Sequence, residues 1–244
     1  MAFSMFSVLP VPKTEWNEKN MKYLLAAFPA VGAVLGLLEW GLYELLLSTG
    51  APMIFRSALL SVTPVLYTGG IHLDGFMDVC DAQGSNREKE KRLEIMKDPH
   101  IGAFAAIGLI TVMLLSFGCW CGIKTFEPSY FILMPVLSRS LSGLSTAAFP
   151  AAKENGLAAF FKETAAKGRA VSLLTLITVF TGILLMGCGI KGFFITAAAA
   201  VLFLIYHNMA LKKFGGVTGD LSGWFLTLCE LVMMMVYVLT GWTI

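Results

Sequence analysis

Charged side chains are scarce in this chain of 244 residues, of which only 14% are Asp, Glu, Lys or Arg. An average soluble domain carries about 25% charged residues and about 45–50% apolar ones. Here hydrophobic residues reach 57% and the mean hydropathy is +0.74. This composition excludes an ordinary soluble domain and predicts a protein that lies in a lipid bilayer.

Cysteine motifs and basic stripes are missing as well. The five cysteines show neither CxxC nor zinc-ligand spacing and lie in or beside apolar runs, so we expect small buried hydrophobes rather than disulfides or a metal centre. No run of basic residues is interleaved with aromatic ones, which excludes a nucleic-acid-binding surface. Residues 1–13 place apolar residues before the first lysine and contain two prolines, an order unlike that of a cleavable signal peptide.

Long apolar runs are abundant instead. A membrane-spanning helix needs roughly 20 mostly apolar residues, and no internal repeat or linker divides the chain. We therefore predict an all-α fold in one domain, residues 1–244, forming a polytopic membrane bundle of about seven transmembrane helices. The first span contains Glu39 and Glu44, and the second is short and contains Pro64, so these two are the least regular. The expected spans are 24–48, 53–71, 102–123, 129–150, 170–189, 192–211 and 221–243.

Basic residues lie mostly on one side of these spans. With the N-terminus in the cytosol, 14 of the 18 basic residues fall in cytosolic segments, three fall outside, and Arg139 lies within a span. Because cytosolic loops are enriched in Lys and Arg, this distribution predicts a cytosolic N-terminus. The 14 residues are Lys13, Lys19, Lys22, Arg87, Lys89, Lys91, Arg92, Lys97, Lys153, Lys162, Lys167, Arg169, Lys212 and Lys213.

The five aspartates all fall on the predicted cytosolic side. If a helix continues over 71–83, steps of about 100° place Asp74, Asp78 and Asp81 within an arc of about 60°. Like charges this close repel one another unless they are compensated, and oxygen ligands suit Mg²⁺, with Mn²⁺ as a substitute. We predict that these three carboxylates, together with Asp220, bind a divalent cation. A solvated helix face is the alternative.

Further candidates follow in the next polar stretch and at the start of the aspartate helix. Arg92 and Lys97 can donate hydrogen bonds to phosphate oxygens that the cation also contacts. The alternative is that this stretch is an ordinary salt-bridged loop. We take Lys97, Asp98 and His72 as catalytic candidates and Arg92 as a phosphate contact. His72 would lie off the face formed by the carboxylates, so a structural role for it stays open.

A glycine-rich segment, GGVTGD at 215–220, precedes the final span beside Lys212. Backbone N–H groups left free at a helix N-terminus bind anions, so Lys212, Gly216 and Thr218 are candidate phosphate contacts. A plain turn capped by Asp220 would give the same pattern.

Arg139 is the one basic residue inside a predicted span. A charge there is expensive, so we expect a phosphate or an acidic partner, with snorkelling towards the headgroups as the alternative. Glu230 lies well inside the last span and has the same two interpretations, functional or structural.

Taken together, these segments resemble the cobalamin-5′-phosphate synthase family, also called adenosylcobinamide-GDP ribazoletransferase. The resemblance covers essentially the whole chain and is most specific in GGIHLDGFMDVCDA at 69–82 and LEIMKD at 93–98. The chain departs from the family pattern after the second block, where it has Pro99 and His100. The other matching segments are 6–12, 28–36, 138–139 and 215–220.

The resemblance implies an enzyme of the prokaryotic inner membrane whose active site faces the cytosol. Its substrates would be adenosylcobinamide-GDP and α-ribazole or α-ribazole 5′-phosphate, and its cofactor Mg²⁺. A ribazole hydroxyl would attack the cobinamide-proximal phosphate and expel GMP. A homo-oligomer is left open.

Two other functions were weighed. An intramembrane prenyltransferase would require a second Asp-rich motif, whereas GGVTGD supplies a single carboxylate. A small ion-coupled transporter would place its carboxylates near mid-membrane, often with inverted repeats, whereas here they cluster at one edge.

Overall fold

The computed structural model describes residues 1–12, 21, 23–152, 159 and 167–243. Within these residues the secondary structure is helical apart from one isolated bridge between Ala151 and Val217. The predicted all-α fold is therefore confirmed. The helices are α1 (Ala2–Phe6), α3 (Phe28–Ser48), α4 (Met53–Thr68), α5 (Ile71–Gly84), α6 (Lys89–Ile95), α7 (Ala103–Gly122), α8 (Pro128–Ala148), α10 (Lys167–Gly187), α11 (Ile190–Met209), the π-helix η1 (Ala210–Phe214) and α12 (Gly219–Thr243).

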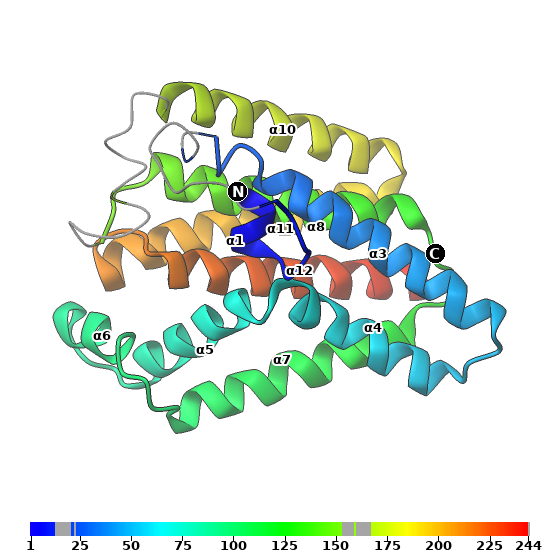
Figure 1. The fold of residues 1–244 in the computed structure, drawn as a ribbon, viewed down its shortest axis with the longest axis horizontal. Helices are drawn as coiled ribbons and strands as arrows, with labels where there is room; N and C mark the ends of the chain where they lie inside the picture. The colour runs from blue at the N-terminus through cyan, green and yellow to red at the C-terminus, as the bar shows by residue number, and fades with distance from the viewer. Residues whose placement is uncertain (13–20, 22, 153–158, 160–166, 244) are drawn as a thin grey trace.

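Six of these helical stretches are long and apolar enough to cross a membrane: α3, α7, α8, α10, α11 with η1, and α12. They correspond to six of the seven expected spans. Figure 1 shows most of the long helices running along the longest axis of the molecule, side by side. The prediction of a polytopic bundle with about seven transmembrane helices is confirmed, because a bent pair of helices supplies the seventh when it is counted as one span.

The bent pair is α4 and α5, which meet at an angle of 94°. Gly69 and Gly70 separate them and have φ angles of +64° and +81°, a left-handed region that glycine enters without steric cost. The Gly70 N–H donates to the Val65 carbonyl at 2.9 Å, which ends α4. The expected short span over 53–71 is therefore present as α4, after which the chain turns sharply and α5 continues towards α6 (Figure 1).

Helix α8 lies at the centre of the bundle, and 72% of its most apolar window is buried. It packs closely against α3, where Cβ atoms on Gly32 and Gly36 would collide with the backbone of Pro135 and Phe131. Small residues four apart let two helix backbones approach in this way within a membrane. Large apolar side chains on α7, α10 and α11 remain exposed, as expected of a surface that faces lipid.

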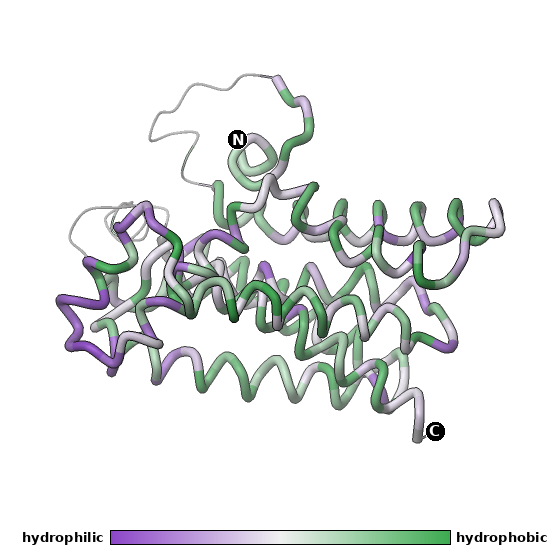
Figure 2. The backbone as a smooth tube through the Cα atoms, turned by 90° about the horizontal axis from the view of Figure 1, so that it is seen from below, coloured by the Kyte–Doolittle hydropathy of each residue, from purple (hydrophilic) through white to green (hydrophobic). Residues whose placement is uncertain are grey.

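Polar residues gather at one end of the bundle. Figure 2 shows hydrophilic backbone at the end that carries α6, whereas the long helices are mostly hydrophobic along their length. The exposed residues at this end include Lys89, Glu90 and Lys91 on α6 and Lys212 and Lys213 on η1. This end therefore combines basic side chains with the C-terminal end of α5.

Candidate active site

The expected helix over 71–83 is present as α5, and it carries all three aspartates of the predicted face. Asp74 is exposed, whereas Asp78 and Asp81 are half-buried. Asp74 lies in the first turn, where the positive end of the helix dipole favours a carboxylate. The residues between them, such as Phe76 and Val79, are buried, so the helix packs one side into the bundle.

The final helix brings a fourth carboxylate to α5. A Cβ on Gly75 would come 2.8 Å from the Cα of Asp220, and a Cβ on Gly223 would come 3.1 Å from the carbonyl oxygen of His72. Gly75 on α5 and Gly223 on α12 therefore let the backbones of the two helices come into contact. The expected proximity of Asp220 to the aspartate helix is observed.

Asp81 has a structural task that its position in the sequence does not reveal. Its carboxylate accepts hydrogen bonds from the backbone N–H groups of Gly102 at 2.7 Å and Ala105 at 2.8 Å. Gly102 is the N-cap residue of α7 and Ala105 lies in its first turn, and α7 has no capping side chain of its own. Asp81 thus caps α7 from a neighbouring helix, so its carboxylate is already partly engaged.

Because of these two hydrogen bonds, Asp81 should contribute more to the stability of the protein than the other aspartates do. Loss of a capping carboxylate costs about 0.5–2 kcal/mol, so we expect Asp81→Ala to lower the melting temperature of the metal-free protein. Asp74→Ala is the matched control: the lost interaction with the helix dipole and the relieved repulsion between like charges act in opposite directions, so its melting temperature should change less than that of Asp81→Ala. Equal melting temperatures for the two variants would contradict the capping role.

The carboxylates fit one particular mode of metal binding. Among the residues that the structure describes, no three Asp, Glu, His or Cys side chains converge closely enough to hold a metal ion alone. Mg²⁺ is usually held by one or two carboxylates, with waters and substrate phosphates completing its shell. Oxygen ligands from α5 and α12, namely Asp74, Asp78 and Asp220, suit that mode. The divalent cation therefore stays a prediction in which the substrate supplies part of the coordination.

The glycine-rich loop is built differently from the expectation. The N–H groups of Gly215, Gly216 and Val217 donate to the carbonyls of Leu211, Ala210 and Pro150 at 2.8–3.0 Å. They are occupied, so the expected free backbone donors are wrong for these three residues.

The cap of α12 also differs from the sequence interpretation. The side-chain oxygen of Thr218 accepts from the Leu221 N–H at 3.1 Å, and Asp220 lies in the first turn of the helix. Thr218 is therefore the capping residue, and its hydroxyl also donates to the Asp220 carboxylate at 3.5 Å. Direct phosphate contacts by Gly216 and Thr218 stay predictions.

Basic side chains surround this loop. Arg92 on α6 reaches the carbonyl of Lys213 on η1 at 3.4 Å, and a Cβ on Gly215 would collide with the Lys89 side chain. Lys212 and Lys213 are exposed beside them. The structure thus places Arg92, a predicted phosphate contact, beside the segment that carries Lys212, another predicted phosphate contact. Lys89 lies beside the same segment. We call Lys89, Arg92, Lys212 and Lys213 the basic cluster.

Lys97 and Asp98 lie on the surface just after α6, and both are exposed. Asp98 accepts from the His100 ring at 2.7 Å and from the His100 backbone N–H at 3.0 Å. These hydrogen bonds, that of the ring first, lower the pKa of the Asp98 carboxyl, which keeps it ionised and makes it a weaker proton acceptor. Catalytic roles for Lys97 and Asp98 stay predictions.

His72 is buried at the start of α5 and faces away from the aspartates. Its ring lies 5.9 Å from the Phe6 ring and 5.6 Å from the Phe28 ring, measured between centroids. The expectation that His72 lies off the carboxylate face agrees with this packing. Its catalytic role stays a prediction.

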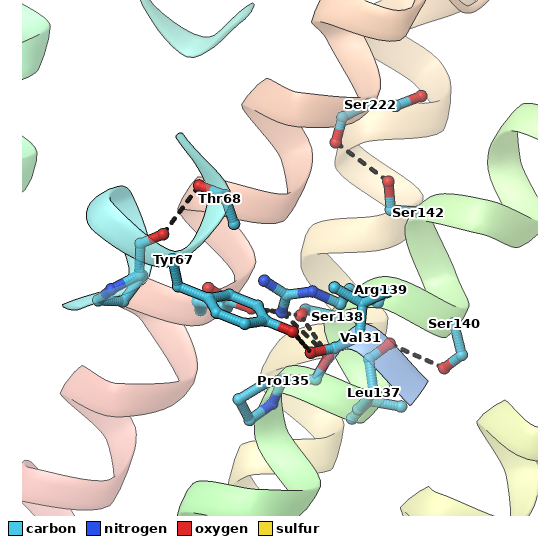
Figure 3. Close-up of polar contacts among 12 residues, drawn as sticks. Val31, Tyr67, Thr68, Pro135, Leu137, Ser138, Arg139, Ser140, Ser142 and Ser222 are labelled. Carbon is cyan, nitrogen blue, oxygen red and sulfur yellow. Dashed lines mark hydrogen bonds and ion pairs between the residues drawn. The ribbon is translucent and has the colours of Figure 1, made fainter. Parts of the chain in front are cut away.

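Arg139 is fully buried on α8, and its partner is acidic. The guanidinium donates from Nη1 to Oε1 of Glu230 on α12, and Ser138 donates to the same oxygen at 2.7 Å. Figure 3 shows Arg139 beside Ser138 and the Tyr67 ring, in the middle of the bundle. Snorkelling is therefore wrong, and the expected acidic partner is Glu230. A phosphate contact by Arg139 stays a prediction.

The chain matches the family model for cobalamin-5-phosphate synthase over residues 1–238. It belongs to the cobalamin-5-phosphate synthase family. Three relatives carry the name adenosylcobinamide-GDP ribazoletransferase. One from Lachnoclostridium phytofermentans is 42% identical over 95% of this chain and 89% of its own length. One from Clostridium perfringens is 33% identical over 94% of this chain and 92% of its own length. One from Geobacillus kaustophilus is 34% identical over 91% of this chain and 88% of its own length. No solved structure matches the chain.

The match to the family model spans residues 1–238, and every candidate site residue lies in this range. The range includes α5, the basic cluster and the Arg139–Glu230 pair. Two residues of interest were not proposed from sequence. Lys89 was counted only as a cytosolic charge, although its spacing of three from Arg92 on a helix signals a shared face. Glu39 was noted only as an irregularity of the first span, yet it is buried. Of the five cysteines, Cys119 and Cys229 are buried as expected, Cys80 and Cys121 are half-buried, and Cys188 is exposed, so the expectation of burial is wrong for Cys188.

Proposed function

We propose that this chain transfers α-ribazole, or α-ribazole 5′-phosphate, to adenosylcobinamide-GDP and releases GMP, which completes the nucleotide loop of a cobalamin. Family membership and the names of its relatives support the reaction. One structural observation supports the site: α12 packs the backbone of Asp220 against α5 at Gly75, the residue that follows Asp74. The prenyltransferase and the transporter alternatives have no such support.

In this reaction a ribazole hydroxyl attacks the phosphate next to cobinamide. A new O–P bond forms, the bond from that phosphorus to the GMP oxygen breaks, and the hydroxyl proton passes to a base. A bound Mg²⁺ or Mn²⁺ would neutralise charge on the phosphate oxygens. Asp74, Asp78 and Asp220 would hold it. Arg92 and Lys212 of the basic cluster, on the adjacent polar end of the bundle, would orient the diphosphate through charge-assisted hydrogen bonds.

The experiment that tests this function uses the purified protein in detergent. With adenosylcobinamide-GDP, α-ribazole and Mg²⁺ present, we expect GMP and a product whose mass equals that of the joined cobamide. Omission of either substrate should stop GMP release, because the reaction is a bimolecular displacement. GMP release without the ribazole would indicate a hydrolase instead.

We also propose that the site faces the cytosol and that the membrane is the prokaryotic inner membrane. The distribution of basic residues supports this orientation. In a variant whose five native cysteines are replaced, single cysteines placed over 85–95 should resist a membrane-impermeant thiol reagent in intact cells and react after permeabilisation. Labelling of these positions in intact cells would reverse the orientation.

A further inference from the structure

A cavity of about 110 Å³ lies inside the bundle, among residues of α3, α4, α5, α7, α8 and α12. Part of its wall is apolar and includes Val112 on α7. Another part is polar, because Glu39, His72, Arg139 and Glu230 line it. Charged side chains at membrane depth are costly, so a cavity that carries them marks a functional site by default.

One edge of the Arg139 guanidinium is unused, although the residue is fully buried. Its Nη1 donates to Glu230 and to the Pro135 carbonyl. Its Nε and Nη2 are buried and have no hydrogen-bond partner among the residues that the structure describes. These two nitrogens lie on the same edge of the planar guanidinium, so their N–H groups point in nearly the same direction. The Phe28 ring, centred 5.8 Å from the guanidinium carbon, offers a π face but no oxygen or nitrogen as acceptor.

His72 repeats this pattern on α5. Its Nε2 is buried, and no residue in the described part of the chain hydrogen-bonds to it. The side chain is 9% exposed and lines the same cavity as Arg139. A buried polar group without a partner loses its hydrogen bonds to water and gains none in return. The unpaired nitrogens of both residues therefore require an occupant of the cavity.

The polar wall restricts what this occupant is. An apolar molecule would leave the nitrogens of Arg139 and His72 unpaired. An anion would add a further negative charge to a cavity where one guanidinium already faces two carboxyl groups, those of Glu39 and Glu230. A cation would be repelled by Arg139, and no three metal-binding side chains converge among the described residues. The occupant is therefore small, uncharged, and able both to accept and to donate hydrogen bonds.

We propose that this cavity is a hydrated site, in which ordered waters join Glu39 on α3 to the unused edge of Arg139 on α8 and to Nε2 of His72 on α5. A water molecule takes up about 30 Å³, so a cavity of about 110 Å³ has room for about three. Buried waters of this kind typically make about three hydrogen bonds each. Here they accept from Arg139 and donate to the Glu39 carboxyl oxygens.

The waters connect three helices at one end of the aspartate helix. His72 lies in the first turn of α5, two residues before Asp74. Water-mediated hydrogen bonds are nearly as favourable in enthalpy as direct ones. The hydrated site therefore ties the start of α5 to α3 and α8, whose side chains do not reach His72 through hydrogen bonds within the described residues.

The first test detects the waters in the wild-type protein in detergent. Brief X-ray irradiation turns water into hydroxyl radicals, and radicals formed from bound water oxidise the methionines beside it to the sulfoxide. Met134 and Met234 line the cavity and are 5% and 9% exposed, whereas Met233 is 0% exposed and does not line it. We expect Met134 and Met234 to be oxidised several-fold faster than Met233. Equal rates for the three residues would mean a dry cavity and overturn the proposal.

The second test fills the cavity from α7, where Ser116 lines it. In a hydrated cavity, Ser116→Leu displaces water and leaves Arg139 unpaired, so the melting temperature should fall and the fast oxidation of Met134 should disappear. In a dry cavity the larger side chain would fill a void and raise the melting temperature. Ser172→Leu, at an exposed serine on α10, is the matched control and should change neither measurement. A melting temperature that does not fall, or a fall in a protein whose Met134 is still oxidised quickly, overturns the proposal.

Discussion

Asp78→Ala is expected to lower turnover by roughly 10²-fold or more while the protein still folds. A carboxylate that holds the cation on a transferring phosphate acts mainly in the transition state, and a 10²-fold loss corresponds to about 3 kcal/mol. Asp78 is half-buried on α5, in the helix that Asp220 touches. The measurements are GMP release at saturating substrates and the rise in melting temperature on adding Mg²⁺.

The control for this prediction is Glu90→Ala, which removes an exposed carboxylate from α6. It should behave as wild type in both measurements. Asp74→Ala and Asp220→Ala should resemble Asp78→Ala, since the proposed coordination shares the cation among the three residues. Near-normal turnover together with a normal Mg²⁺-induced shift in Asp78→Ala would remove Asp78 from the metal site and would favour a solvated helix face.

Arg139→Met is expected to give the largest loss of stability of any variant considered for this protein. The substitution leaves Glu230, whose side chain is 21% exposed, without its cation, and breaking a buried ion pair from one side costs at most about 3–5 kcal/mol. For a chain of this size that loss corresponds to a fall in melting temperature of about 10 °C. The measurement is thermal unfolding of the detergent-solubilised protein without substrates.

The double variant Arg139→Met with Glu230→Gln tests the cause. It removes both charges and keeps an oxygen that can accept from Ser138, so it should recover most of the lost stability. Arg87→Met, an exposed arginine between α5 and α6, is the control and should change the stability by less than about 0.5 kcal/mol. A double variant as unstable as Arg139→Met would mean that the guanidinium stabilises through packing, for instance on Phe28, rather than through the ion pair.

These predictions depend on how α5 is supported. Three of its neighbours act on it at different points: α12 touches Gly75, the first turn of α7 binds Asp81, and the aromatic rings of Phe6 and Phe28 enclose His72. The helix is therefore held along its whole length, and its aspartates have defined positions before any ligand binds. Such preorganisation is what a phosphoryl transfer requires of a protein, because the reaction depends on alignment and charge stabilisation.

Local sequence determined the helices and the candidate aspartates. Runs of about 20 apolar residues can satisfy their backbone hydrogen bonds in lipid only as helices, so six spans were predictable within a few residues. The helix over 71–83 was a condition of the aspartate prediction, and α5 meets it by placing Asp74, Asp78 and Asp81 on one element. The requirement that a buried Arg139 have a partner also follows from its position in a span.

Only the tertiary structure decided which groups meet. Asp81 caps a helix that begins 22 residues later, and Arg139 pairs with Glu230, 91 residues away. The Val217 N–H donates to the carbonyl of Pro150, which lies in a distant segment of the chain. Composition and periodicity report on neighbours in the chain, whereas these contacts depend on how close two helix backbones can pack. That closeness was set at Gly75, Gly223 and the Gly69–Gly70 bend, where the absence of a side chain matters only once the opposing helix is known.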